Sequence, residues 1–169
     1  MVLTIGVTLH INPAVAVGLW VDKQIEPAEA LAYIIVQILG GIAAALLLVG
    51  IFGGTESGLG ASRLNPEINV WQGLLIETIL TFFLVNTIYN AAVSGKAKMA
   101  AGAAIGLALT FAIFFGGNLT GASLNPARTI GPDVVTGDFS DIWIYIVGPD
   151  WWIGRISGND GRVVSRGQL

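Results

Sequence analysis

Two short stretches of sequence decide the fold of this chain, His10-Ile-Asn-Pro-Ala-Val15 and Ser123-Leu-Asn-Pro-Ala-Arg128. Asparagine is a favoured residue immediately before a helix, and proline is favoured at the first helical position. The repeat therefore predicts that one helix begins at Pro13 and another at Pro126. The two asparagines are 113 residues apart, so each half of the chain carries one copy of the motif.

Both predicted helices are too short to cross a membrane. The second covers the 11 residues Pro126–Thr136, which is ~16 Å at 1.5 Å per residue, or half of a ~30 Å hydrocarbon core. Two half-length helices at corresponding positions of two halves are typical of an inverted-repeat transport fold.

The sequence around these motifs has the composition of an integral membrane protein. Hydrophobic residues make up 54% of the 169 residues and charged residues only 11%, whereas ordinary soluble chains carry about 25% charged residues. Three apolar stretches are long enough to cross the bilayer: Ala28–Phe52, Val70–Ala92 and Met99–Gly117. A fourth stretch, Ile142–Trp152, is too short to cross alone. We therefore expect an all-α integral membrane fold.

The charges in the connecting segments predict which side of the membrane each one faces. Lys23 precedes the first full span, and Lys96 and Lys98 lie between the second and third. The 53–69 loop carries two glutamates and one arginine. Because lysine and arginine favour cytoplasmic loops, the lysine links are expected inside and the 53–69 loop outside.

Composition also excludes several classes of function. The basic residues before position 150 are scattered, which excludes a nucleic-acid-binding stripe. There is no cysteine and one histidine, so disulfides, thiolate chemistry and a histidine-based metal site are not expected. No Ser/His/Asp set and no phosphate-binding glycine loop is present. We therefore expect neither an enzyme nor a cofactor.

With both motifs in place, the sequence strongly resembles the aquaporin (major intrinsic protein) family. The matching features run from about Ile5 to Pro149. They are His10, Gln37 and Gly40, the glutamate Glu77, and the signature Gly121-Ala-Ser-Leu-Asn-Pro-Ala-Arg-Thr-Ile-Gly-Pro132. The resemblance implies an inverted repeat of spans with two re-entrant half-helices. It also implies a passive water channel in the cell (plasma) membrane that assembles as a homotetramer with one pore per subunit.

The family has six spans, so the resemblance also implies that part of the fold lies outside this chain. We expect the first span, most of the second and the end of the last to be missing, with residues 1–9 forming the last turns of a span. Residues 1–149 would then be a partial channel domain. Residues 150–169 would be a polar tail unlike the family, possibly out of frame.

The resemblance assigns five residues to the pore. Asn12 and Asn125 would each cap a half-helix and present an amide N–H to water, which accepts from both and cannot relay a proton. Arg128 would line the outer constriction and repel cations. Counting back from Asn125 gives Ile113 and Ala122 as further filter positions. An isoleucine and an alanine there resemble archaeal-type members more than the main water or glycerol classes.

Six further residues are expected to support the pore loops. Glu77 is a lone carboxylate in a span, and the resemblance implies that it accepts hydrogen bonds from backbone N–H groups before Asn125. His10 would brace the first loop. The remaining four are the residues that follow each asparagine: Pro13, Ala14, Pro126 and Ala127.

The substrate is left open between water and small neutral solutes. Thr129 and Tyr145 occupy positions where they favour the water branch, whereas Asp133 matches neither branch. The expected partners are therefore water, small neutral solutes and the lipid bilayer. The alternatives are a glycerol or small-solute facilitator within the family, and a non-conducting fragment or structural membrane subunit.

Overall fold

The computed structural model describes residues 10–93 and 98–150, and every regular element in them is a helix. The predicted polar tail begins at Asp150, which the structure describes; its other residues, 151–169, and the predicted turns at residues 1–9 lie outside the described residues. Among these described residues, three helices are long and apolar enough to cross a membrane. They are α2 (Pro27–Phe52), α3 (Val70–Ile88, continued by a π-helical turn, η2, Tyr89–Val93) and α4 (Ala101–Thr120, preceded by the 3₁₀ turn η3, Lys98–Ala100). The all-α membrane fold is thus confirmed, with span ends within a few residues of those expected.

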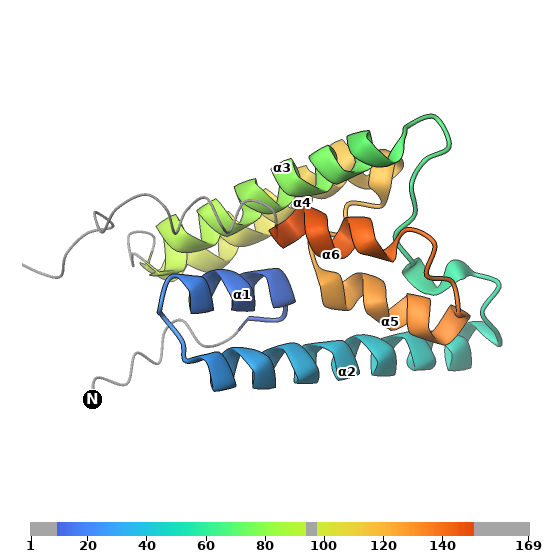
Figure 1. Cartoon of the computed structure of the whole chain (residues 1–169), viewed down its shortest axis with the longest axis horizontal. Helices are drawn as coiled ribbons and strands as arrows, with labels where there is room; N and C mark the ends of the chain where they lie inside the picture. The colour runs from blue at the N-terminus through green and yellow to red at the C-terminus, as the bar shows by residue number, and fades with distance from the viewer. Residues whose placement is uncertain (1–9, 94–97, 151–169) are drawn as a thin grey trace, which may run out of the picture.

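Three short helices lie between the long ones. α1 (Pro13–Val21) and α5 (Pro126–Thr136) are the two half-helices, and each begins at the proline of its motif. α6 (Ile142–Asp150) is the described part of the fourth apolar stretch. In Figure 1 these three helices lie between α2 on one side and the pair α3 and α4 on the other.

The two half-helices point in opposite directions (Figure 1). α1 leads into α2 through a short turn, and α5 leads into α6. The N-terminal ends of α1 and α5 face each other in the middle of the molecule, and their C-terminal ends point to opposite ends of it (Figure 1). This is the arrangement that an inverted repeat requires.

The helix pairs pack closely where small residues meet. α2 crosses α5 at Gly41 and Gly131, and a Cβ added to either glycine would collide with backbone atoms of the other helix. α3 packs against α4 and α6. The glycines thus set the distance between the long helix and the half-helix that carries the second motif.

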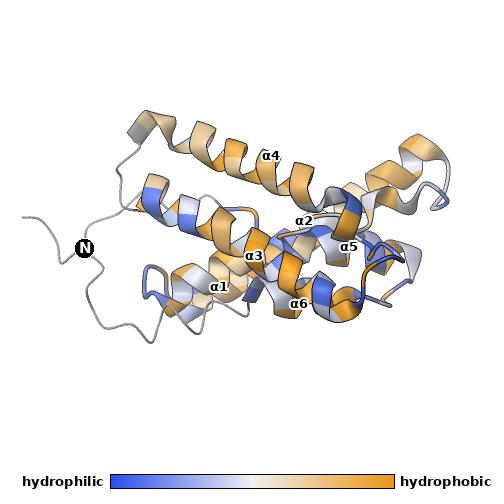
Figure 2. Ribbon diagram, turned by 90° about the horizontal axis from the view of Figure 1, so that it is seen from above, coloured by the Kyte–Doolittle hydropathy of each residue, from blue (hydrophilic) through white to orange (hydrophobic). Residues whose placement is uncertain are grey.

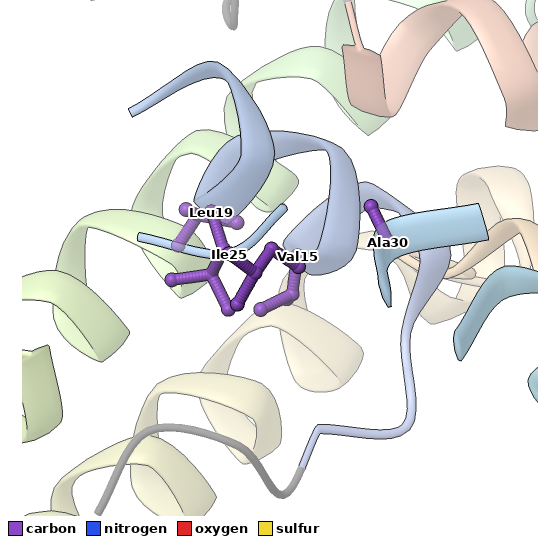
Figure 3. Close-up of a cluster of buried hydrophobic side chains, with 5 residues drawn as sticks. Val15, Leu19, Ile25 and Ala30 are labelled. Atoms are coloured by element: carbon purple, nitrogen blue, oxygen red, sulfur yellow. The ribbon is translucent and has the colours of Figure 1, made fainter. Parts of the chain in front are cut away.

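Two buried apolar clusters hold the half-helices in place. Val15 and Leu19 of α1 pack against Ile25, Ala30 of α2 and Val85 of α3 (Figure 3). The second cluster joins α3, α4 and the loop before α5; it consists of Leu80, Leu84, Ala112, Ala122 and Leu124.

The outer faces of the long helices are apolar and exposed. On α2 the exposed side chains include Leu39, Leu47 and Phe52, and on α4 they include Phe111 and Phe114. Figure 2 shows hydrophobic residues along most of α4, with hydrophilic residues gathered mainly at loops and helix ends. Such faces are suited to contact with lipid chains rather than with water.

The 53–69 loop closes one end of the molecule. It contains a 3₁₀ turn, η1 (Gly58–Gly60), whose Leu59 is buried. α3 then begins with a reciprocal cap, in which the Asn69 side chain accepts from the backbone of Gln72 and the Gln72 side chain accepts from the backbone of Asn69. The loop therefore ends in a well-defined helix start.

Candidate functional site

Each asparagine of the repeated motif caps its own half-helix. Asn12 Oδ1 accepts from the N–H of Ala14 at 2.9 Å. Asn125 Oδ1 accepts from the N–H of Ala127 at 3.0 Å and of Arg128 at 3.4 Å. Proline at the next position needs no partner because it has no N–H. The motif thus satisfies backbone donors that a helix start leaves unpaired.

The amide nitrogens of the two asparagines cross to the opposite half of the chain. Asn12 Nδ2 donates to the carbonyl oxygen of Leu124 at 2.8 Å, and Asn125 Nδ2 donates to that of Ile11 at 2.9 Å. Each contact is made to the residue immediately before the other asparagine. Since an amide group has two N–H donors, one N–H of each asparagine is used here and the other is left.

These two reciprocal hydrogen bonds join the two motifs into one site. It was not predicted that one amide N–H of each asparagine would be used by the protein itself. The sequence carries no signal for these bonds, because every residue has a backbone carbonyl and the bonded residues are 112 and 114 positions apart. The consequence is that the two helix starts are fixed relative to each other by hydrogen bonds as well as by packing.

The loop before α5 has a strained backbone that a buried carboxylate holds. Ala122 and Leu124 have φ values of 42° and 53°, a left-handed conformation that side chains other than glycine adopt at a cost. Glu77 Oε1 accepts from the N–H of Ser123 at 3.0 Å, and Oε2 from that of Leu124 at 2.8 Å. Thr120 Oγ1 donates to the same carboxylate at 2.6 Å.

The first loop is braced by a different set of polar groups. Gln37 Nε2 of α2 donates to the carbonyl oxygen of His10 at 2.9 Å and lies 3.0 Å from His10 Nδ1. The ring of His10 lies 4.3 Å from that of Tyr33, centroid to centroid. His10 Nε2 is buried without a partner among the described residues. His10 therefore connects the first motif to α2.

A cavity of about 340 Å³ lies where the two motifs meet. The five residues predicted to line a pore all border it: Asn12, Ile113, Ala122, Asn125 and Arg128. His10 and Ser123 add polar groups. The rest of the wall is apolar and comes mostly from α1, α3 and α4, including Leu19, Leu84, Ile88, Ile105 and Leu109.

The supporting residues of each motif lie behind this wall. Pro13, Ala14, Pro126 and Ala127 are buried and do not border the cavity. Ile113 is 49% exposed, whereas Ala122 is only 2% exposed. Of the two apolar filter positions, the isoleucine therefore presents far more surface. Thr129 and Tyr145 are fully buried away from the cavity.

Arg128 is oriented by groups outside its own helix. Its Nη1 donates to Ser62 Oγ, in the 53–69 loop, and its Nη2 donates to the carbonyl oxygen of Gly121 at 3.3 Å. Ser62 is fully buried and also accepts from Thr129 Oγ1 at 3.3 Å. Sequence reasoning missed Ser62, because nothing in its neighbourhood resembles a motif.

An ion-pair cluster lies next to this contact. Arg63 Nη1 donates to Asp133 Oδ1 at 2.6 Å, and Arg63 Nε lies 3.1 Å from Asp138 Oδ2. Partial burial opposes the charge of the guanidinium, but the hydrogen bond and charge of Asp133 outweigh it and raise the pKa of Arg63. Donors of Ser140 lower the pKa of Asp138. The sequence held two hints of this pair. Arg63 is the one basic residue of the 53–69 loop, and Asp133 matches neither branch of the family.

Fold and site together define a class of protein. The chain is a multi-pass membrane protein in which two opposed half-helices meet at one cavity. The family's sequence profile matches residues 3–158, and the chain belongs to the major intrinsic protein family. The resemblance seen in the sequence is thus confirmed.

Known proteins of this family are similar over most of the chain. Aquaporin AqpM of Methanothermobacter thermautotrophicus is 44% identical over 83% of this chain and 61% of its own length. Probable aquaporin TIP1-2 of Oryza sativa subsp. japonica is 39% identical over 83% and 56%, and aquaporin-4 of Mus musculus 39% over 83% and 44%. The similarity to AqpM agrees with the expected likeness to archaeal members.

A solved structure shows the same fold. The X-ray structure of the aquaglyceroporin from Plasmodium falciparum superposes with a TM-score of 0.66 at 22% identity, over 89% of this chain and 72% of that one. Measured against the sequence relatives, the chain spans about 61% of the length of AqpM and a smaller share of the length of the other two.

Proposed function

We propose that this chain forms a passive channel for water and small neutral solutes that excludes protons and ions. The observation that supports it most is the pair Asn12 and Asn125 at the facing starts of two half-helices, beside one cavity. Each keeps one amide N–H that neither its cap nor its cross-bond uses. Membership of the major intrinsic protein family, with aquaporins among the relatives, also supports the proposal.

The mechanism follows from two effects at the facing helix starts, their partial positive charge and the amide N–H donors that orient water. Each helix start carries roughly half a positive charge, so two facing starts oppose the passage of any cation. Two amide N–H donors bind the oxygen of a passing water, and its hydrogens then point away from both. A water held in this way accepts but does not donate, so a chain of waters cannot relay a proton through the site.

The proposed outer filter combines a fixed charge with apolar walls. Arg128 offers N–H donors to the permeant and repels cations. Ile113 and Ala122 make the filter less polar than a strict water pore would be. Water therefore passes, and small uncharged solutes of suitable width pass as well. A preference for glycerol is the alternative within the same mechanism.

The proposal extends to assembly and location. We infer a homotetramer with one pore per subunit, in the cell (plasma) membrane, surrounded by lipid at the apolar faces of α2 and α4. The proposed partners are water, neutral solutes and lipid. Transport of this kind requires no cofactor and no covalent step.

The test is conduction in vesicles that contain the purified, correctly inserted chain. We expect faster osmotic shrinkage than in protein-free vesicles, without faster dissipation of a pH gradient. Unchanged water permeability would contradict the channel and favour the alternative, a non-conducting fragment or structural subunit.

A matched pair of substitutions separates the pore role of the asparagines from capping. Serine also caps helices well, but it lacks the amide N–H. Asn125→Ser removes the amide N–H at the cavity together with the bond to Ile11. We expect it to increase proton leak by about tenfold, the equivalent of about 1.4 kcal/mol at the barrier. Asn69→Ser removes the amide of an exposed cap far from the cavity and should change nothing. Equal effects at both positions would refute the pore role.

A further inference from the structure

The position of the Arg128 guanidinium depends on the 53–69 loop. One of its nitrogens donates to Ser62 Oγ, and the other contact is the carbonyl oxygen of Gly121 at 3.3 Å. The loop is tightly fitted here, since a Cβ added to Gly121 would lie 3.0 Å from Ser62 Cα. A shift of Ser62 would therefore release the guanidinium.

The next residue, Arg63, fixes Ser62 in place. Arg63 Nη1 donates both to the carbonyl oxygen of Ser62 at 2.7 Å and to Asp133 Oδ1 at 2.6 Å. Its Nη2 donates to the carbonyl oxygen of Asp138 at 3.3 Å, and its Nε pairs with the carboxylate of the same residue. One side chain thus ties the loop backbone at Ser62 to α5 and to the turn after it.

Burial makes this pairing strongly favoured. The Asp133 side chain is fully buried, and its Oδ2 has no partner within the described part of the chain. A buried carboxylate without a cation is highly unfavourable, so Asp133 holds Arg63 firmly. The planar guanidinium can address several acceptors at once, which a lysine ammonium on its flexible stem does less well.

The rest of the loop has anchors of its own. Leu59 is buried, and η1 packs against α2 and α5. On the other side of Arg63, the Asn65 N–H donates to the carbonyl oxygen of Leu119 at 2.8 Å, and Asn65 Nδ2 donates to that of Asn118 at 2.9 Å. Loss of Arg63 should therefore free only the middle of the loop.

We propose that Arg63 and Asp133 are a positioning pair for selectivity, which holds Ser62 against Arg128 and so fixes the charge and width of the outer constriction. Neither residue borders the cavity; they act through Ser62. The inference rests on the proposed channel function for its biological meaning, but the contacts it concerns can be tested separately.

The first test compares two permeabilities of the same vesicles. In Arg63→Ala, the ratio of urea to water permeability should rise by about threefold to tenfold, as expected when the equivalent of one ordinary hydrogen bond is lost. Arg63→Lys keeps the charge and should recover part of the change. Glu67→Gln alters an exposed acid of the same loop and should leave the ratio unchanged. A merely structural loss would lower both permeabilities and leave their ratio constant.

The second test does not require conduction. The chain, labelled with 15N-arginine in lipid nanodiscs, reports hydrogen exchange of the Arg128 guanidinium, whose signals are assigned by their loss in Arg128→Lys. Exchange should be several-fold faster in Arg63→Ala and Asp133→Asn, and unchanged in Glu67→Gln. If Arg63→Ala does not insert, Asp133→Asn and Arg63→Lys are compared in the same way.

The outcomes separate the two proposals. A chain that inserts but does not conduct refutes the proposed function, and exchange alone then decides the positioning pair. Unchanged Arg128 exchange in the variants overturns the pair whatever the permeabilities are. In a conducting chain, an unchanged ratio of urea to water permeability overturns it too.

Discussion

Among the single residues, Arg128 carries a full charge at the edge of the cavity. It follows Asn125 by three positions, and its guanidinium donates to Ser62 and Gly121 rather than to a carboxylate. Neutral acceptors orient the group without cancelling its charge. The charge therefore remains available at the cavity, where it acts on whatever approaches.

We expect Arg128→Ala to widen the constriction and remove this charge. Urea and glycerol should then cross several-fold faster, and cation or proton leak should appear. Arg128→Lys is the control, because it keeps the charge while it loses the planar donors. Vesicle swelling and ion-flux measurements on matched preparations test this. Unchanged solute uptake and unchanged leak would place Arg128 outside the pore.

Glu77 stabilises a backbone that would otherwise relax. Its carboxylate accepts three hydrogen bonds, one from Thr120 at the end of α4 and two from Ser123 and Leu124 in the loop before Asn125. Two residues of this loop other than glycine, Ala122 and Leu124, have positive φ. In Glu77→Gln, an NH₂ group would face one of these donors and leave it unpaired. We expect a loss of about 1.5–3 kcal/mol in the free energy of unfolding, the range for hydrogen bonds to charged groups.

Thermal unfolding in detergent, read by circular dichroism, measures this loss. Glu67→Gln makes the same chemical change on the exposed loop and serves as the control. If the two variants melt alike, the carboxylate does not hold the loop.

At the scale of helices, the contact between α2 and α5 depends on two glycines. Gly41 and Gly131 meet backbone to backbone, while the neighbouring Gly40 has open space around its Cα. The structure thus offers a test site and a control site one residue apart on the same helix.

We expect Gly41→Ala to destabilise the chain by about 1–3 kcal/mol, the usual cost of overpacking, because α5 must move away from α2. Gly40→Ala should be neutral or slightly stabilising, since alanine favours helix. Unfolding in detergent compares the two. A shift of α5 should also lower water permeability in Gly41→Ala, and equal behaviour of both variants would contradict the close crossing.

The helices could be predicted from the sequence much better than their contacts. The Asn-Pro-Ala repeat gave the starts of α1 and α5, because capping is a local effect. Apolar length gave α2, α3 and α4 within a few residues. The Ser62–Arg128 bond could not be predicted, since it joins a loop without motif to a helix 66 residues away. The positive φ of Ala122 and Leu124 also escaped prediction, because neither is a residue that favours it.

For the molecule as a whole, the charges predict one orientation in the membrane. Lys23 lies between α1 and α2 at one end of the molecule, and the 53–69 loop lies at the opposite end (Figure 1). Family membership and the three apolar helices establish that the chain passes the membrane several times, while the direction stays a prediction.

Single-cysteine labelling tests the direction cleanly, because the chain has no native cysteine. We expect Glu67→Cys to react with an impermeant maleimide added outside intact cells, and Lys23→Cys to react only after permeabilisation. Labelling of both from the same side would show that the span between them does not cross. Reversed labelling would show that the positive-inside tendency does not set this orientation.

The reciprocal bonds of Asn12 and Asn125 have a consequence for biosynthesis. Asn12 and its acceptor Leu124 are 112 residues apart, and at a synthesis rate of about 5–20 residues per second the acceptor emerges roughly 6–22 s later. During this interval the first half-helix has no partner, and its polar start cannot be stable within the hydrocarbon. α1 should therefore wait at the membrane surface and enter only when the second motif arrives, which makes the closing of this contact a late, long-range step in assembly.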